Sequence, residues 1–60
     1  MTYRIGLGIA PALGDLRRAG PGDIILFLHD ARERPDWGRY WQAAAVAVFR
    51  GAALTVVTAE

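Results

Sequence analysis

The sequence contains no cysteine, so no disulfide can stabilise the fold and no thiolate can bind a metal. It also contains no serine and no lysine, so the only basic side chains are arginines. The one histidine is too few for a histidine-based metal site. We therefore expect no metal and no cofactor, and the absence of cysteine leaves the redox compartment undetermined.

Strong charge and long apolar runs are also missing. The formal net charge is +1, which argues against nucleic-acid binding through a basic surface. The longest apolar helical run, Ala43 to Phe49, is far shorter than the ~20 residues needed to cross a bilayer. No charged segment followed by a sustained apolar one marks a signal peptide. We expect a cytoplasmic protein that binds neither membranes nor nucleic acids.

Chain length limits what the fold can bury. We expect residues 1–60 to form one small domain, and a core of this size seldom supplies more than ~3–5 kcal/mol. Disulfides and metals are excluded above, so association with another chain is the remaining common way to stabilise such a fold. We expect the partner to be a second copy or a larger protein.

The segment Asp23 to Asp30 contains five consecutive apolar residues between a Pro-Gly turn and a cluster of charges. A short apolar run of this kind predicts a strand that is buried on both faces of a parallel sheet. Alternating apolar residues predict a second strand over Thr2 to Ile9, and Ala52 to Thr58 is predicted as a third.

Two helices are predicted between these strands. Pro11 to Ala19 indicates a short helix, with Gly20 as a left-handed stop. This connection is long enough for a parallel crossover, although a wide hairpin is an alternative. Asp36 is a good N-cap for a long helix from Trp37 to Arg50, which Gly51 would end.

The long helix is apolar on every side from Ala43 to Phe49. A helix of that kind is normally buried on every side, which two short strands and a small helix cannot achieve. We therefore expect its outer face to contact another molecule. The predicted interface residues are Trp37, Tyr40, Trp41, Ala44, Val48 and Phe49. Trp37, Tyr40 and Trp41 could alternatively form a stacking platform for a base or a sugar.

Together these elements predict an α/β fold. It would be a small βαβαβ unit with a three-stranded, mainly parallel sheet, equivalent to half of a doubly wound fold, and oligomeric. The Gly6-Leu7-Gly8 segment suggests a dinucleotide-binding loop, but Pro11 occupies the place of the third glycine. Glycines that allow close packing on a strand are the simpler interpretation.

One segment resembles a known family. Residues 21–60, with Leu28-His29-Asp30 at the end of an apolar strand, resemble the last strand–helix–strand of NodB-type polysaccharide deacetylases. The resemblance implies that His29 would be the general acid in hydrolysis of N-acetylated sugars and that Asp30 would orient it. The family's metal-binding aspartate pair and His-x-x-x-His segment have no counterpart in this sequence.

Two functions follow from these patterns. The first is a non-enzymatic assembly or protein-interaction module. The second is a small-ligand or hydrolase-like site beyond the carboxyl end of the central strand, where open α/β sheets bind ligands. Its candidate catalytic residues are His29 and Asp30, with Arg32 and Arg34 binding the ligand. A strand-end histidine with a structural hydrogen bond is the alternative interpretation of His29.

Overall fold

A computed structural model describes residues 1–57 of the chain. It contains the expected βαβαβ order with one additional 3-10 helix, η1. The elements are β1 (Thr2–Ile5), α1 (Leu13–Arg17), β2 (Ile24–Phe27), η1 (Ala31–Glu33), α2 (Trp37–Phe49) and β3 (Ala53–Val56). Both strand pairs are parallel, so the crossover prediction is confirmed and the hairpin alternative is wrong.

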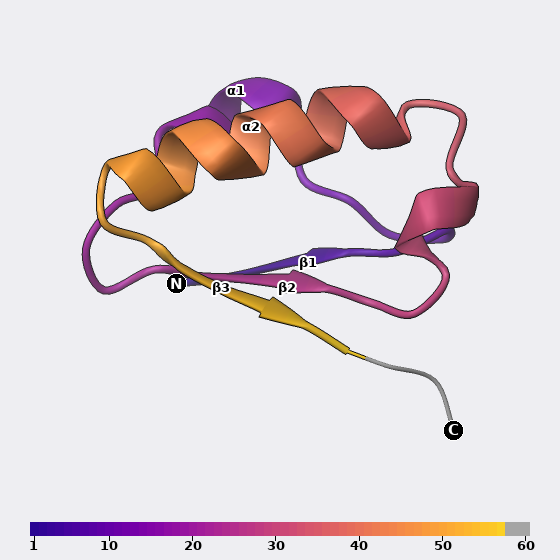
Figure 1. Ribbon diagram of the computed structural model, residues 1–60, viewed down its shortest axis with the longest axis horizontal. Coiled ribbons are helices and arrows are strands. Elements are labelled where there is room, and N and C mark those ends of the chain that lie inside the picture. Colours follow the sequence, from indigo (N-terminus) through magenta and orange to yellow (C-terminus); the bar gives the residue numbers. More distant parts are fainter. Residues whose placement is uncertain (58–60) are drawn as a thin grey trace.

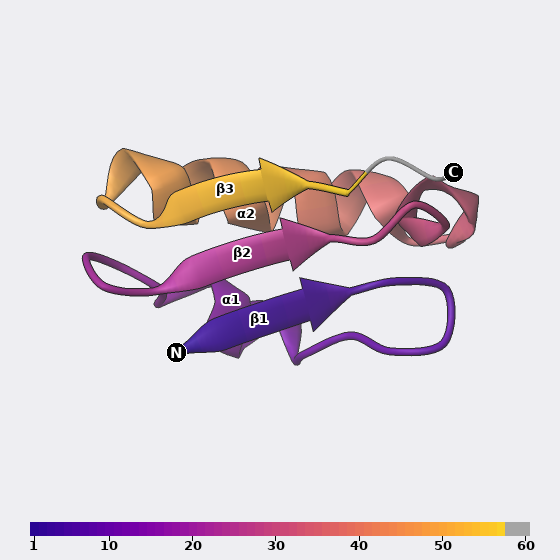
Figure 2. The same cartoon turned by 90° about the horizontal axis from the view of Figure 1, so that it is seen from below.

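The described residues form two layers, a sheet in the order β1-β2-β3 and a layer with both α-helices (Figures 1 and 2). Both crossovers move the chain in the same direction across the sheet. Two right-handed connections therefore place both helices on the same face. α1 and α2 cover that face, and no described element covers the other (Figure 2).

The core lies between the sheet and the helices. Its largest fully buried side chains are Ile5, Leu16, Ile25 and Phe27. The long helix contributes mainly small side chains, the buried Ala43, Ala44 and Ala47, which allow α2 to pack closely beside α1.

Several predicted bounds were too long. β1 ends at Ile5 because the Gly6 N–H donates to the Ile9 carbonyl over 2.7 Å, which turns the chain back on itself. α1 starts only at Leu13, since Ala12 has an extended backbone. The left-handed glycine before β2 is Gly22 rather than the predicted Gly20.

At the other end of the chain, the predicted glycine stop is confirmed. Gly51 has φ of +113°, directly after α2 and the αR residue Arg50. β3 is shorter than predicted, and Thr58 lies outside the described residues.

The predicted burial of β2 on both faces is wrong for the single chain. Ile25 and Phe27 are fully buried beneath the helices, whereas Ile24 on the other face of the strand is 43% exposed. Only one face of this apolar strand is fully buried, because the fold provides one helical layer and not two.

The long helix is likewise not buried all round. By their spacing, five apolar residues are predicted to form one stripe along the helix: Trp37, Tyr40, Trp41, Ala44 and Val48. The buried face is formed instead by Tyr40, Ala43, Ala44 and Ala47. Trp41 and Val48 of that stripe are exposed, and so is Phe49, at 93%. α2 packs against both the sheet and α1. These two neighbours together bury a different side of the helix from the one that the spacing of apolar residues indicates.

Candidate functional site

The loops that follow β1 and β2 meet at the carboxyl edge of the sheet, and Arg34 joins them. Its Nη1 donates to the Gly6 carbonyl over 2.8 Å. Its Nε and Nη2 donate to the two carboxylate oxygens of Asp36 over 2.8 and 3.2 Å. Its guanidinium carbon also lies 5.0 Å from the centre of the Tyr40 ring. Through these contacts, Arg34 fixes the loop after β1 against the start of α2.

The electrostatics of this contact are mutual. The hydrogen bonds from Arg34 hold the pKa of Asp36 below its ordinary value, and the Asp36 carboxylate raises the pKa of Arg34. Asp36 does stand at the N-cap of α2, as predicted, but its side chain makes no capping hydrogen bond. The two carboxylate oxygens instead accept from the Arg34 guanidinium in a bidentate charged pair.

Asp30 also helps to hold these loops together. Its Oδ1 accepts a hydrogen bond from the Leu7 N–H over 3.1 Å. Gly6 lies so close that a Cβ there would be 3.0 Å from the same oxygen and 2.8 Å from Leu28 Cδ1. The glycine is therefore explained by close packing of the two loops.

The four predicted site residues divide into two groups. Asp30 and Arg34 hold the loops together, and the Arg34 side chain is only 17% exposed. His29 and Arg32 are exposed and line a separate groove. No hydrogen bond joins His29 to Asp30 within residues 1–57, so the structure does not bring the proposed acid and its orienting carboxylate together.

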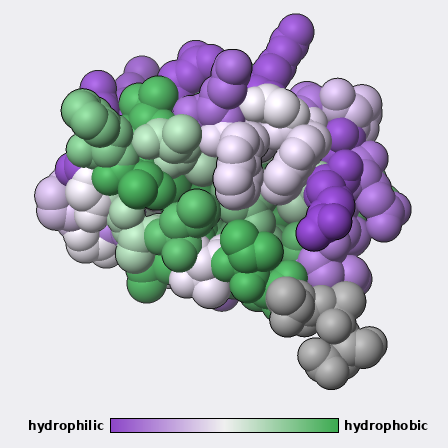
Figure 3. All heavy atoms as spheres, viewed as in Figure 1, coloured by the Kyte–Doolittle hydropathy of each residue, from purple (hydrophilic) through white to green (hydrophobic). Residues whose placement is uncertain are grey.

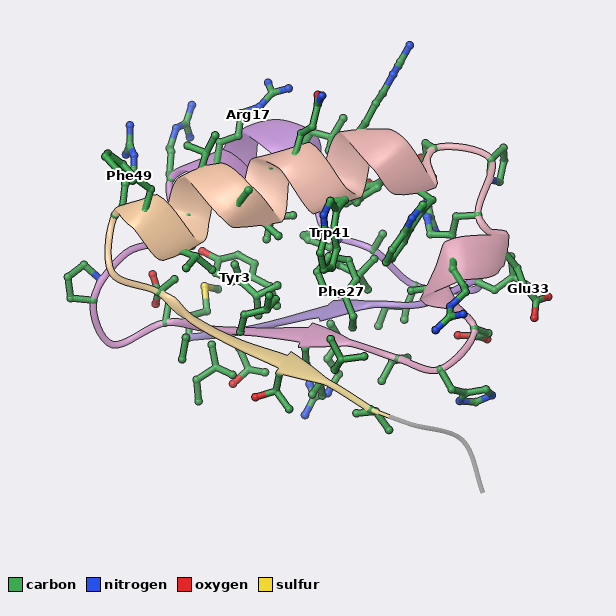
Figure 4. The ribbon with its side chains drawn as sticks, in the orientation of Figure 1. Tyr3, Arg17, Phe27, Glu33, Trp41 and Phe49 are labelled. Atoms are coloured by element: carbon green, nitrogen blue, oxygen red, sulfur yellow. The ribbon has the colours of Figure 1, made fainter. Side chains whose placement is uncertain are left out.

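A groove lies beyond the carboxyl ends of β2 and β3, with a volume of about 740 Å³. Trp37 and Trp41 form its aromatic wall, and both rings lie about 5 Å from the ring of Phe27. Figure 4 shows Trp41 pointing from α2 toward Phe27 on β2. The remaining lining residues are Leu28, His29, Arg32, Glu33, Val56 and Val57.

The groove combines flat apolar surface with a few ionisable groups. The tryptophans offer faces for stacking, and Arg32 and Glu33 could pair with charges on a ligand. His29 supplies an imidazole, which can accept and donate a proton. Within residues 1–57, no three histidine, aspartate or glutamate side chains gather to form a metal site.

A second candidate surface lies beside the groove. We call it the β3–α2 face and define it by Trp41, Ala45, Val48, Leu54 and Val56. All five side chains are exposed, and the first four, with Ala44, line a shallow hollow of about 250 Å³. Hydrophobic side chains gather on this side of the molecule, with hydrophilic ones along its margins (Figure 3).

The predicted interface residues are only partly on this face. Trp41 and Val48 belong to it, and Phe49 is exposed at the end of α2. Tyr40 and Ala44 are buried in the chain's own core, and Trp37 is half-buried in the groove wall. Sequence reasoning missed the contribution of β3. The sequence does contain an indication that β3 contributes to this face, because the segment Ala52 to Val57 carries no charge.

Comparison with known proteins gives no relative. No protein-family model, curated protein or solved structure matches the chain. In the part of the chain that the structure describes, no helix is long and apolar enough to cross a membrane.

Proposed function

We propose that the protein is a non-enzymatic α/β assembly module that acts as a homo-oligomer or as a subunit of a larger protein complex. The observation that carries this proposal is the β3–α2 face. Isolated exposed apolar side chains are normal on a protein, but a continuous apolar patch commonly marks an interaction surface. The proposal includes the cytoplasmic location that the sequence led us to expect.

Two further features support this function. The uncovered face of the sheet exposes Ile24, so the chain leaves apolar surface on more than one side. All four residues of β3 are exposed, although β3 forms a third of the sheet. A neighbouring molecule would supply the contacts that this strand lacks within its own chain.

Sedimentation equilibrium tests the proposal directly. We expect the measured mass to exceed that of one 6.5 kDa chain at micromolar concentration and to fall on dilution. A mass that stays at one chain over the whole concentration range would contradict the homo-oligomer. Co-purification of a stoichiometric partner would then be required for the subunit form of the proposal.

The groove supports a second candidate function, a small-ligand or hydrolase-like site related to the deacetylases that the sequence resembles. His29 would transfer the proton, Asp30 would hold the loop, and the tryptophan wall would stack against a sugar ring. The probe is N-acetylglucosamine. We expect it to raise the melting temperature of the wild type and not that of His29→Ala, whereas an unchanged wild-type temperature would argue against this function.

A further inference from the structure

The outer edge of β3 has hydrogen-bonding groups directed away from the sheet. The Ala53 N–H donates to the Asp23 carbonyl and the Val57 N–H donates to the Phe27 carbonyl. Backbone groups alternate in direction along a strand, so those of Leu54 and Val56 point outward. No strand pairs with this edge within residues 1–57.

This edge lacks the features that normally prevent pairing. Native edge strands are usually protected by charged side chains, proline or bulges. β3 reads Ala-Leu-Thr-Val and has none of them. The opposite edge strand, β1, carries Arg4, and the charged amino terminus of Met1 precedes it.

We infer that a second copy of this chain covers the β3–α2 face, by antiparallel pairing of β3 with the partner's β3 about a twofold axis at Thr55. The inference rests on the proposed assembly function and specifies its interface. Leu54 would exchange both backbone hydrogen bonds with the partner's Val56, and the reverse pair would do the same. Thr55 would face the partner's Thr55, a favourable cross-strand pair.

The helices fit the same arrangement. In Figure 2, α2 lies behind β3 and the gap between β3 and β2, beside the free edge of the sheet. A twofold axis perpendicular to the sheet would place the two copies of α2 on the same face of the joined sheet, one on each side of the axis. Trp41, Ala45 and Val48 would then meet the partner's helix.

Charge and size favour a copy of the chain over another occupant. Residues near a twofold axis meet their own equivalents, so a charged patch would repel itself, whereas the uncharged β3–α2 face matches itself. A standard interface takes ~800 Å² from each partner, about a fifth of the 3968 Å² surface of this chain. The broadest side of the molecule measures 28 × 22 Å. Figure 1 views this side directly, and β3 and α2 are the elements nearest the viewer.

A charge exchange at the axis tests the inference by sedimentation equilibrium. We expect Thr55→Glu alone and Thr55→Lys alone to weaken the dimer by about tenfold or more, since like charges would face each other. An equimolar mixture of the two should restore it. Thr2→Glu and Thr2→Lys are matched controls on β1 and should dimerise like the wild type.

A second pair of variants tests the backbone contact. Val56→Pro removes an outward N–H but leaves the ladder to β2 intact, so the fold should persist by circular dichroism and the dimer should be lost. Val56→Thr keeps the N–H and should retain the dimer. If the wild type dimerises but neither Thr55 charges nor Val56→Pro weaken it, the β3 interface is wrong and the assembly function stands. If the wild type is a monomer, the inference fails together with the homo-oligomer.

Discussion

At the scale of single residues, the carboxyl edge of the sheet is organised by internal contacts. The sequence predicts that Arg34 binds a ligand, yet each of its described hydrogen bonds is made within the chain. Its bond to Asp36, two positions away, is local. Its bond to the Gly6 carbonyl spans 28 residues and depends on how the two loops are placed, so no sequence pattern indicates it.

The tight approach at Gly6 gives the first prediction. Gly6→Ala would place a methyl group 2.8 Å from Leu28 Cδ1, and the neighbours would have to shift. We expect a loss of about 1–2 kcal/mol in the free energy of unfolding, measured by urea denaturation. Gly8→Ala is the matched control, because nothing lies within 4 Å of the position of its Cβ. Equal effects at the two positions would contradict the packing argument.

Asp23 gives a prediction about pH. Its carboxylate accepts hydrogen bonds from the Gly20 N–H and from the Met1 ammonium, each over 3.0 Å. These contacts, the Gly20 bond foremost, lower the pKa of Asp23. A lowered pKa stabilises the fold above the unfolded value of ~3.9, and this stability is lost as pH falls through the lower folded value. We therefore expect the melting temperature to fall below about pH 4.

The Asp23 contribution can be separated by substitution. Asp23→Asn removes the charge, so its melting temperature should depend less on pH in the acid range than that of the wild type. Some dependence should remain, because the pKa of Asp36 is lowered too. Asp15→Asn changes an exposed carboxylate in α1 and should retain the wild-type acid loss. An Asp23→Asn profile parallel to the wild type would contradict the assignment.

At the scale of elements, α1 depends on its surroundings. A helix of five residues is too short to be stable alone. Leu16 anchors it in the core, and the Tyr40 hydroxyl donates to the carbonyl of Pro11, just before the helix, over 2.7 Å. The long helix therefore positions the short one.

Tyr40→Phe tests this connection. The ring and its packing remain, while the hydrogen bond to the Pro11 carbonyl is lost, so we expect a loss of about 1 kcal/mol in unfolding free energy. Amide hydrogen exchange should show the larger increase in α1. Tyr3→Phe is the control, since the Tyr3 hydroxyl makes no hydrogen bond within residues 1–57. Faster exchange in β2 and none in α1 would show that Tyr40 does not hold the short helix.

At the scale of the whole molecule, the fold covers one face of its sheet and leaves the β3–α2 face exposed. If a second copy covers that face, folding and association are linked. A partner that binds only the folded state stabilises it by mass action. We therefore expect the melting temperature of the wild type to rise with protein concentration.

The matched comparison is Thr55→Glu, which places a charge on the proposed axis. Its melting temperature should depend less on protein concentration than that of the wild type, because its dimer is weaker. Scanning calorimetry at several concentrations measures both proteins. A flat wild-type profile would argue against linked association.

The sequence alone determined the order and type of the elements. The apolar run before His29 indicated a strand, the spacing from Trp37 onward indicated a helix, and Gly51 ended that helix as predicted. Such signals are local, since turn residues, caps and periodicity act on the few neighbouring residues that form one element.

Only the tertiary structure decided which side of each element is buried. Tyr40 lies inside while Trp41 lies at the surface, and Ile25 is buried while Ile24 is exposed. It also decided that His29 and Asp30, neighbours in sequence, have different surroundings: His29 lines the groove, and Asp30 binds the loop after β1. The physical reason is that burial and hydrogen bonding depend on which distant segment packs against a residue, and the two crossovers placed α1 and α2 on the same face of this sheet.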